Sequence, residues 1–279
     1  GSVSKLYTDI AAMQLVEQGR LDLDAPVTEY LPDFGKAVTL RQLMAHRSGL
    51  VREPPVGSYF DPAPPPIADV VGSLRATEFA VSPGAKTKYS NAALMTVGHV
   101  VETVAGRPFA EHMRRAVFEP LGMTETSFER EARLEPRIPR ALMWSYDGRE
   151  FPAPAFDVLA SAGNLYSTMP DQAELLKAVF RGGRPILRSE TLQAMFEPQF
   201  GADSSYGLGF ALSTLDGRRR VSHGGAVYGF ATSWAALPDD KLGVVASASL
   251  DVANSVVDAI ATQALRALAA RREGRQEPA

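Results

Sequence analysis

Residues 206–250 read YGLGFALSTLDGRRRVSHGGAVYGFATSWAALPDDKLGVVASASL, and this stretch decides the fold class. Its first residues alternate large apolar with small side chains, and the dipeptide Asp216-Gly217 then separates them from a second apolar run. This pattern predicts a β-hairpin with a tight turn. Two further strands are predicted at 229–237 and 242–250. Successive strands without helices between them favour an antiparallel sheet.

Helical spacing of apolar residues is found on both sides of this stretch. Residues 4–18 predict a helix that ends before Gly19. A last helix is predicted over 252–271, with Ile260, Leu265 and Leu268 facing inward. Because helices and strands segregate along the chain instead of alternating, the sequence predicts an α+β fold in which helices flank the antiparallel sheet.

The predicted organisation is a single domain over residues 1–279. A sheet lobe would combine residues 1–20 with 201–271, and a mostly helical lobe would hold residues 21–200. Residues 272–279 are polar and predict a disordered tail.

The composition excludes several classes of function. The chain has 279 residues, no cysteine and a formal net charge of −3. A weakly acidic chain exerts no general attraction on nucleic acid, and a chain without cysteine has no disulfide, thiolate metal site or cysteine nucleophile. No two histidines show helical zinc-site spacing, and no apolar run reaches the roughly 20 residues of a membrane span. We therefore expect no metal or organic cofactor, no nucleic-acid partner and no membrane span in the given chain.

Ser2-Val3-Ser4-Lys5 is an S-x-x-K motif at the start of the first predicted helix. Residues three apart share one face of a helix, so the Ser2 hydroxyl and the Lys5 amine can touch. The positive end of the helix dipole assists an oxyanion and lowers the pKa of a nearby lysine. A buried lysine with a lowered pKa can act as general base for a serine nucleophile. Taken alone, the pattern is more often a capped helix with an incidental lysine.

Tyr89-Ser90-Asn91 precedes another predicted helix. A tyrosine hydroxyl near a lysine ammonium can lose a proton or relay one. The Asn91 side chain offers a donor and an acceptor to a substrate amide or ester. The alternative is structural, with Ser90 or Asn91 capping the helix and Tyr89 packing in the interior.

His223-Gly224-Gly225 follows the predicted hairpin strand and precedes another predicted strand. Two glycines beside a strand permit a ligand to approach the backbone closely. The N–H of Ala226 is a candidate oxyanion donor, with the N–H of Ser2 as the second. The alternative is a glycine-rich strand end with a surface histidine.

Two other features have structural interpretations. We expect His46 to fix a turn through hydrogen bonds and not to take part in catalysis. The basic run Arg218-Arg219-Arg220 is expected to guard a solvated edge strand. Recognition of a substrate carboxylate is the alternative for this run.

In this chain order the three motifs resemble those of the serine β-lactamase and penicillin-binding protein superfamily. The similar branch contains class C β-lactamases, D-aminopeptidases, D-alanyl-D-alanine carboxypeptidases and related esterases, and its motif order is S-x-x-K, then Y-x-N, then a K/H/W-x-G triplet. Connecting stretches are similar as well, and they are Leu15–Asp24, Leu43–Leu50, Pro120–Met123 and Ser161–Leu165. The resemblance therefore spans nearly the whole chain.

The resemblance implies a site in the cleft between the two lobes. Ser2 would attack a carbonyl and form an acyl-enzyme, while Lys5 and Tyr89 would carry its proton to the leaving group. The implied substrate is a small-molecule ester, a β-lactam or a D-amino-acid peptide. The implied substrate-binding residues are Asn91, His223, Gly225 and Ala226.

The sequence departs from the family in two ways. Family members normally carry a helix and two strands before S-x-x-K, and these are not part of this sequence. In addition, His223-Gly224-Gly225 replaces the Lys-Thr-Gly of class C β-lactamases, so a hydroxyl is lost and the cation is weaker at neutral pH. This favours ester, D-amino-acid peptide or amide substrates over β-lactams. Three functions stay open: an ester or β-lactam-like hydrolase, a D-aminopeptidase or D-Ala-D-Ala carboxypeptidase, and an inactive or non-turnover acyl-binding remnant.

Overall fold

A computed structural model describes residues 1–57, 61, 65–154, 160–202 and 204–275. Its helices are α1 (Ser4–Glu17), α2 (Leu40–Met44), α3 (Ile67–Ser73), α4 (Asn91–Ala105), α5 (Phe109–Met113), α6 (Glu119–Leu121), α7 (Ala160–Gly163), α8 (Met169–Phe180), α9 (Ser189–Met195) and α10 (Asn254–Arg272). Its strands are β1 (Leu142–Trp144), β2 (Glu150–Pro152), β3 (Ala211–Leu215), β4 (Arg218–Val227), β5 (Phe230–Leu237) and β6 (Leu242–Ala248).

The main sheet is antiparallel throughout, in the strand order β3-β4-β5-β6, and β1 and β2 form a separate small hairpin. Asp216 and Gly217 connect β3 to β4 with φ angles of 49° and 78°. Two positive φ angles in a two-residue loop match the twist of the strands they join. The expected α+β arrangement and the Asp-Gly hairpin are both confirmed.

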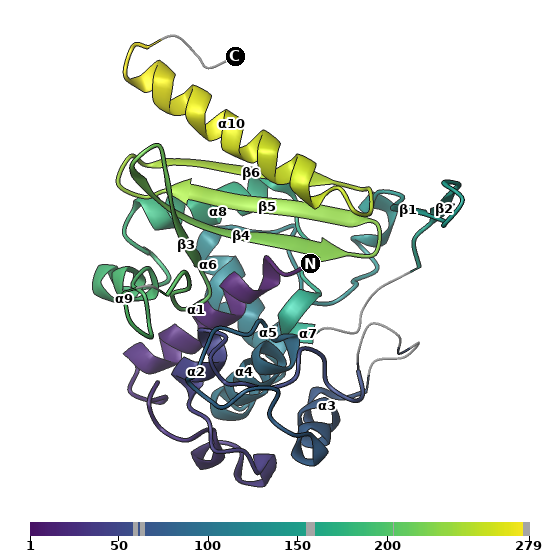
Figure 1. Ribbon diagram of the computed structural model, residues 1–279, viewed down its shortest axis with the longest axis vertical. Helices are drawn as coiled ribbons and strands as arrows, with labels where there is room; N and C mark the ends of the chain where they lie inside the picture. Colours follow the sequence, from purple (N-terminus) through teal and green to yellow (C-terminus); the bar gives the residue numbers. More distant parts are fainter. Residues whose placement is uncertain (58–60, 62–64, 155–159, 203, 276–279) are drawn as a thin grey trace.

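The sheet separates a large core from a small one. Along β5, Trp234 and Ala236 belong to the large core, whereas Ala235 and Leu237 pack with Leu265 of α10. Successive side chains of a strand point to opposite faces, so one buried strand can serve both cores. In Figure 1, α10 lies along one face of the sheet, and the other helices lie beyond the opposite face.

The predicted inward face of α10 is partly wrong. Leu265 is fully buried, but Ile260 and Leu268 are 57% and 41% exposed. The buried face also contains Val257, Ala261 and Ala269, at four-residue spacing from Leu265. Small alanines permit a helix to approach a sheet closely, so side-chain size was a poor guide to the buried face.

The expectation that the basic run guards an edge strand is wrong. Arg218-Arg219-Arg220 begins β4, which has β3 on one side and β5 on the other. The guanidinium groups form ion pairs with acidic side chains of the protein, which are Asp240 and Glu273 for Arg218, Asp239 for Arg219 and Asp258 for Arg220. These pairs neutralise the run, so it offers no unpaired cation to a substrate.

Helix α1 runs through the large core, and its residues from Ser4 to Leu15 are all buried. A hydrogen bond connects α1 to α7, and another connects α7 to α4. The Thr8 hydroxyl donates to the Ser161 carbonyl oxygen at 2.7 Å, and the Ser161 hydroxyl donates to the Leu94 carbonyl oxygen at 3.0 Å. These bonds fix α7 relative to the first turn of α1.

The first residue of the predicted disordered tail, Arg272, is the last residue of α10 in the structure. Residues 276–279 lie outside the described part of the chain. The single domain and its division into two lobes stay predictions. None of the helices in the described part is both long and apolar enough to cross a membrane.

Candidate active site

Ser2 and Lys5 are in direct contact at the start of α1. Ser2 occupies the turn that leads into the helix, and Lys5 is the second helical residue. The Lys5 Nζ lies 3.1 Å from the Ser2 Oγ and donates a hydrogen bond of 2.6 Å to the Ala162 carbonyl oxygen. The side-chain contact expected from the three-residue spacing is therefore present, and α7 supplies a further partner that the sequence did not indicate.

The environment of Lys5 favours its neutral amine. Burial lowers the pKa of Lys5 from 10.5 to about 7, while the charges of Glu53 and Asp9 act in the opposite direction. A neutral amine has two N–H donors and one lone pair. With one N–H donated to the Ala162 carbonyl oxygen, the lone pair can accept the Ser2 proton.

The ring of Tyr89 lies beside the Lys5 amine. Its ring centroid is 5.0 Å from the Lys5 Nζ, and the Arg52 guanidinium carbon is 5.3 Å from the ring. The Lys5 amine and the Arg52 guanidinium therefore both lie against the Tyr89 ring. The S-x-x-K motif and the tyrosine of the second motif thus meet, although Lys5 and Tyr89 are far apart in the sequence.

His46 holds the loop that carries Tyr89. Its Nδ1 accepts the Ser90 backbone N–H at 3.2 Å, and its ring centroid lies 4.3 Å from that of Tyr89. Burial lowers the pKa of His46 well below 6.5, so the ring is neutral and carries its proton on Nε2. This agrees with the expectation that His46 fixes a turn.

The second motif both begins a helix and faces the site. The Ser90 hydroxyl oxygen accepts the Ala93 N–H at 3.0 Å and caps α4, as the structural alternative expected. Asn91 is fully buried, and its Nδ2 donates to the Glu53 Oε1 at 2.7 Å. Burial raises the pKa of this carboxyl above 4.5. Sequence reasoning missed Glu53, because no motif distinguishes it from other surface carboxylates.

Both ring nitrogens of His223 have partners. The Nδ1 lies 2.6 Å from the Gly224 carbonyl oxygen, which only accepts, so Nδ1 carries the proton. The Nε2 therefore accepts from the Tyr206 hydroxyl at 2.7 Å. Burial, followed by the charge of Lys5, lowers the pKa of His223 from 6.5 to about 3. The histidine of the third motif is thus neutral at physiological pH, and neither a weak cation nor a surface residue.

This arrangement predicts that the His223 ring stays neutral from about pH 8 to about pH 5, with the proton on Nδ1. Nitrogen NMR shifts of the labelled ring measure both properties. Because the folded-state pKa of about 3 lies below the unfolded value of 6.5, the stability from neutral His223 is fully present above 6.5 and declines toward pH 3. A Tyr206→Phe variant removes the donor to the neutral ring, so the pKa should rise. A wild-type ring that titrates near the unfolded value would contradict this assignment.

The end of β4 lies against the first residues of the chain, as Figure 1 shows. A Cβ on Gly225 would be 3.2 Å from the Ser2 N and 3.3 Å from the Val3 N, so a larger residue would press on this turn. Asn254 fixes the strand from the other side, with its Nδ2 donating to the Gly225 carbonyl oxygen at 2.7 Å. The Gly1 backbone packs against the Ala226 N. The two backbone segments proposed as oxyanion donors are therefore adjacent.

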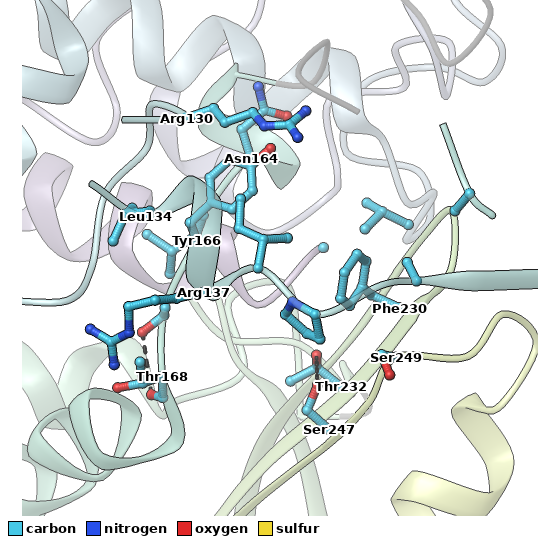
Figure 2. Close-up of a pocket in the computed structure, with 18 of the residues that line it drawn as sticks. Arg130, Leu134, Arg137, Asn164, Tyr166, Thr168, Phe230, Thr232, Ser247 and Ser249 are labelled. Carbon is cyan, nitrogen blue, oxygen red and sulfur yellow. Dashed lines mark hydrogen bonds between the residues drawn. The ribbon is translucent and has the colours of Figure 1, made fainter. Parts of the chain in front are cut away.

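A cavity of about 670 Å³ lies beside this cluster. Val3, Ser4, Asn164 and Phe230 contribute to its lining, and Figure 2 shows Thr232 and Ser247 joined by a hydrogen bond at one wall. Among the described lining residues, Ser2, Lys5, Tyr89 and His223 are absent. The large cavity is thus a neighbour of the candidate site and not its centre.

Comparison with known proteins gives the family. The Beta-lactamase family model matches residues 1–269. The chain belongs to the beta-lactamase family. This beta-lactamase family protein is 25% identical over 221 residues to the teichoic acid D-alanine hydrolase of Staphylococcus aureus, with 77% of this chain and 54% of that protein covered. The chain spans about half the length of the curated relatives it matches.

Solved structures agree with the fold of this beta-lactamase family protein. An octameric penicillin-binding protein homologue from Pyrococcus abyssi has a TM-score of 0.83 and 26% identity, covering 99% of this chain and 66% of that one. D-amino acid amidase from Ochrobactrum anthropi SV3 has a TM-score of 0.79 and 25% identity, covering 99% of this chain and 84% of that one. The expected resemblance is therefore confirmed at the level of family and fold.

Proposed function

We propose that this protein is a serine hydrolase that forms an acyl-enzyme on Ser2. The observation that carries the proposal is the contact between the half-buried Ser2 hydroxyl and a buried lysine whose pKa is lowered to about 7. A serine hydroxyl is a weak nucleophile until an adjacent base accepts its proton. Such a base must be close to the hydroxyl and must be unprotonated. Lys5 lies within hydrogen-bond distance of Ser2 and is substantially unprotonated at neutral pH.

The proposed reaction has two halves. In acylation, the Ser2 Oγ forms a bond to the substrate carbonyl carbon as its proton passes to the Lys5 Nζ. The Ser2 and Ala226 N–H groups stabilise the oxyanion, and the proton continues through the Tyr89 hydroxyl to the leaving group as that bond breaks. In deacylation, water gives a proton to the Lys5 Nζ as its oxygen bonds to the acyl carbon. The bond between this carbon and the Ser2 Oγ then breaks, Oγ takes the proton back from Lys5, and the carboxylic acid leaves.

The substrate class we propose is a D-amino-acid amide or a simple ester. A substrate with a free carboxylate next to the scissile bond needs a cation at the strand of the third motif, but His223 is neutral there. This weighs against D-Ala-D-Ala carboxypeptidase activity and efficient β-lactam hydrolysis. The similar proteins named D-amino acid amidase and teichoic acid D-alanine hydrolase are consistent with the choice.

Labelling with a fluorophosphonate tests the nucleophile. We expect one adduct on Ser2, located by mass spectrometry, and no adduct at that site in Ser2→Ala. Ser4→Ala is the matched control because Ser4 lies on the same turn, where its hydroxyl donates to the Gly1 carbonyl oxygen at 2.6 Å. This variant should keep the adduct on Ser2. A folded wild-type protein that takes no label at Ser2 would overturn the proposal.

Turnover then separates the remaining alternatives. We expect release of nitroaniline from D-alanine p-nitroanilide or of nitrophenol from a short-chain ester, and slower opening of a chromogenic cephalosporin. Faster opening of the cephalosporin would overturn the substrate class but leave the nucleophile intact. Stable labelling with no turnover of any of these substrates would establish a non-turnover acyl-binding protein instead.

A further inference from the structure

Asp9 is a fully buried carboxyl that the proposed reaction does not use. It lies one helical turn after Lys5 on α1, and residues four apart share one helix face. Neither of its oxygens has a hydrogen-bond partner among the described residues. An unpartnered buried carboxyl lowers the stability of a fold, so its position beside the catalytic lysine requires an explanation.

The surroundings of Asp9 contain few groups that can balance its charge. Its carboxyl packs against the backbone of Gly209, where an added Cβ would lie 2.6 Å from the Oδ2. The charge of Asp9 raises the pKa of Lys5 on the same helix and of Tyr206 in the segment before β3. Lys5 is the cation of this set, and it lies four residues before Asp9 on the same buried helix.

We propose that Asp9 is the buried counter-charge of Lys5, and that its carboxylate stabilises the ammonium formed when Lys5 accepts the Ser2 proton. The inference rests on the proposed function. Asp9 acts through Lys5 and is a positioning residue that touches no reacting atom. The balance of the step is unchanged, since the proton passes from the Ser2 Oγ to the Lys5 Nζ and none passes to Asp9.

Other charged groups face Lys5, but they differ from Asp9 in exposure and pairing. Glu53 is half-buried and is shared between Asn91 and Arg52, so solvent and partners screen its charge. The charge of Arg52 opposes protonation of Lys5. His223 on β4 and His46 after α2 are neutral at physiological pH, because burial lowers the pKa of both rings. Burial also lowers the pKa of the Gly1 amine to about 5. Asp9 is thus the completely buried acidic group among these neighbours, and charges interact most strongly where water is excluded.

The two groups influence each other in the expected directions. Burial raises the pKa of Asp9 well above 3.8, and the charge of Lys5 lowers it. Asp9 in turn raises the pKa of Lys5, against the larger effect of burial. When two such groups interact strongly, the successive proton-release steps belong to the pair, so the charge of each group depends on the other.

The pH dependence of Ser2 labelling tests the proposal through an Asp9→Asn variant. Removing the negative charge should lower the pKa of Lys5, so the acid limb of the labelling rate should move to lower pH by about one unit. The plateau rate should also fall, because the amine becomes a weaker base. Asp171→Asn is the control for loss of a buried carboxyl. Asp171 accepts hydrogen bonds from the Glu125 N–H and the Thr126 hydroxyl, so this variant should leave the acid limb of the labelling rate unchanged.

If the acid limb of the labelling rate lies at the same pH in a folded Asp9→Asn protein as in the wild type, the proposal is overturned, even if the plateau rate falls. If that variant does not fold, carboxyl carbon NMR of aspartate-labelled wild-type protein decides the question. Asp9 should then be ionised over the pH range in which Lys5 is protonated near neutrality, and a carboxyl that stays protonated throughout would overturn the proposal. Failure of the proposed function is distinct, because it appears as loss of the Ser2 adduct in wild-type protein.

Discussion

A Lys5→Met variant should fold and label Ser2 at least about 10³-fold more slowly than the wild type, because general bases contribute roughly 10²–10⁴-fold to rate and this lysine also orients the hydroxyl. Methionine has a similar length and suits the fully buried position. The variant leaves the Ala162 carbonyl oxygen without its donor, and Asp9, left without a cation, becomes protonated because burial raises its pKa. It also removes a lysine that burial disfavours in its charged form. We therefore expect a melting temperature within a few degrees of the wild-type value, and loss of rate at nearly constant stability.

Lys36→Met is the matched control. Lys36 is also largely buried, donates to the Thr77 carbonyl oxygen, and lies 5.3 Å from the centroid of the Phe79 ring. It therefore reproduces the loss of a buried lysine without touching the site, and labelling of Ser2 should proceed at the wild-type rate. A Lys5→Met protein that is folded and labels as fast as this control would show that another group accepts the Ser2 proton.

The second large effect is on stability, in a Gly98→Ala variant. Gly98 is in the middle of α4, where an added Cβ would lie 2.1 Å from the Ser161 Oγ and 2.3 Å from its Cβ. These distances are far below van der Waals contact, so α7 must move away from α4. Overpacking of this kind costs roughly 1–3 kcal/mol, and we expect a loss near the upper end, about 3 kcal/mol. Because α7 also carries the Ala162 carbonyl oxygen, labelling of Ser2 should slow as well.

Chemical denaturation with two companion variants checks this result. Gly72→Ala places the same methyl group in α3, where nothing lies within 4 Å of the new Cβ, and it should stabilise the protein slightly through better helix propensity. Adding Ser161→Gly to Gly98→Ala removes the clashing side chain and should restore part of the lost stability. Equal stability of Gly98→Ala and Gly72→Ala would contradict the close approach of α4 and α7.

The features predictable from the sequence are those fixed by local geometry. The contact between Ser2 and Lys5 follows from a three-residue spacing at a helix start, whatever the rest of the chain does. The turn at Asp216-Gly217 follows from the positive φ angles that these two residue types tolerate. Both interactions are complete within a few residues, so the pattern alone contains the necessary information.

The missed features depend on contacts between distant segments. The acceptor for Lys5 is a backbone carbonyl oxygen at Ala162, and a backbone atom has no signature in the sequence. Tyr206 was assigned only to an alternating strand pattern, whereas it holds the ring of His223. Glu53 and Asp9 look like ordinary acidic residues until the fold buries them beside Lys5. The chemistry of a side chain is readable in sequence, but its solvation and partners are not.

The bond from Lys5 to Ala162 joins residues 157 positions apart, and this separation has a consequence during synthesis. Ser2 and Lys5 leave the ribosome long before the residues of α7 do. Until they arrive, the amine is hydrated and keeps the proton of an ordinary ammonium, so the neighbouring hydroxyl is no more reactive than that of free serine. Under the proposed mechanism, Ser2 would become nucleophilic only after α7 has packed against α1, and an incomplete chain would be protected from acylation.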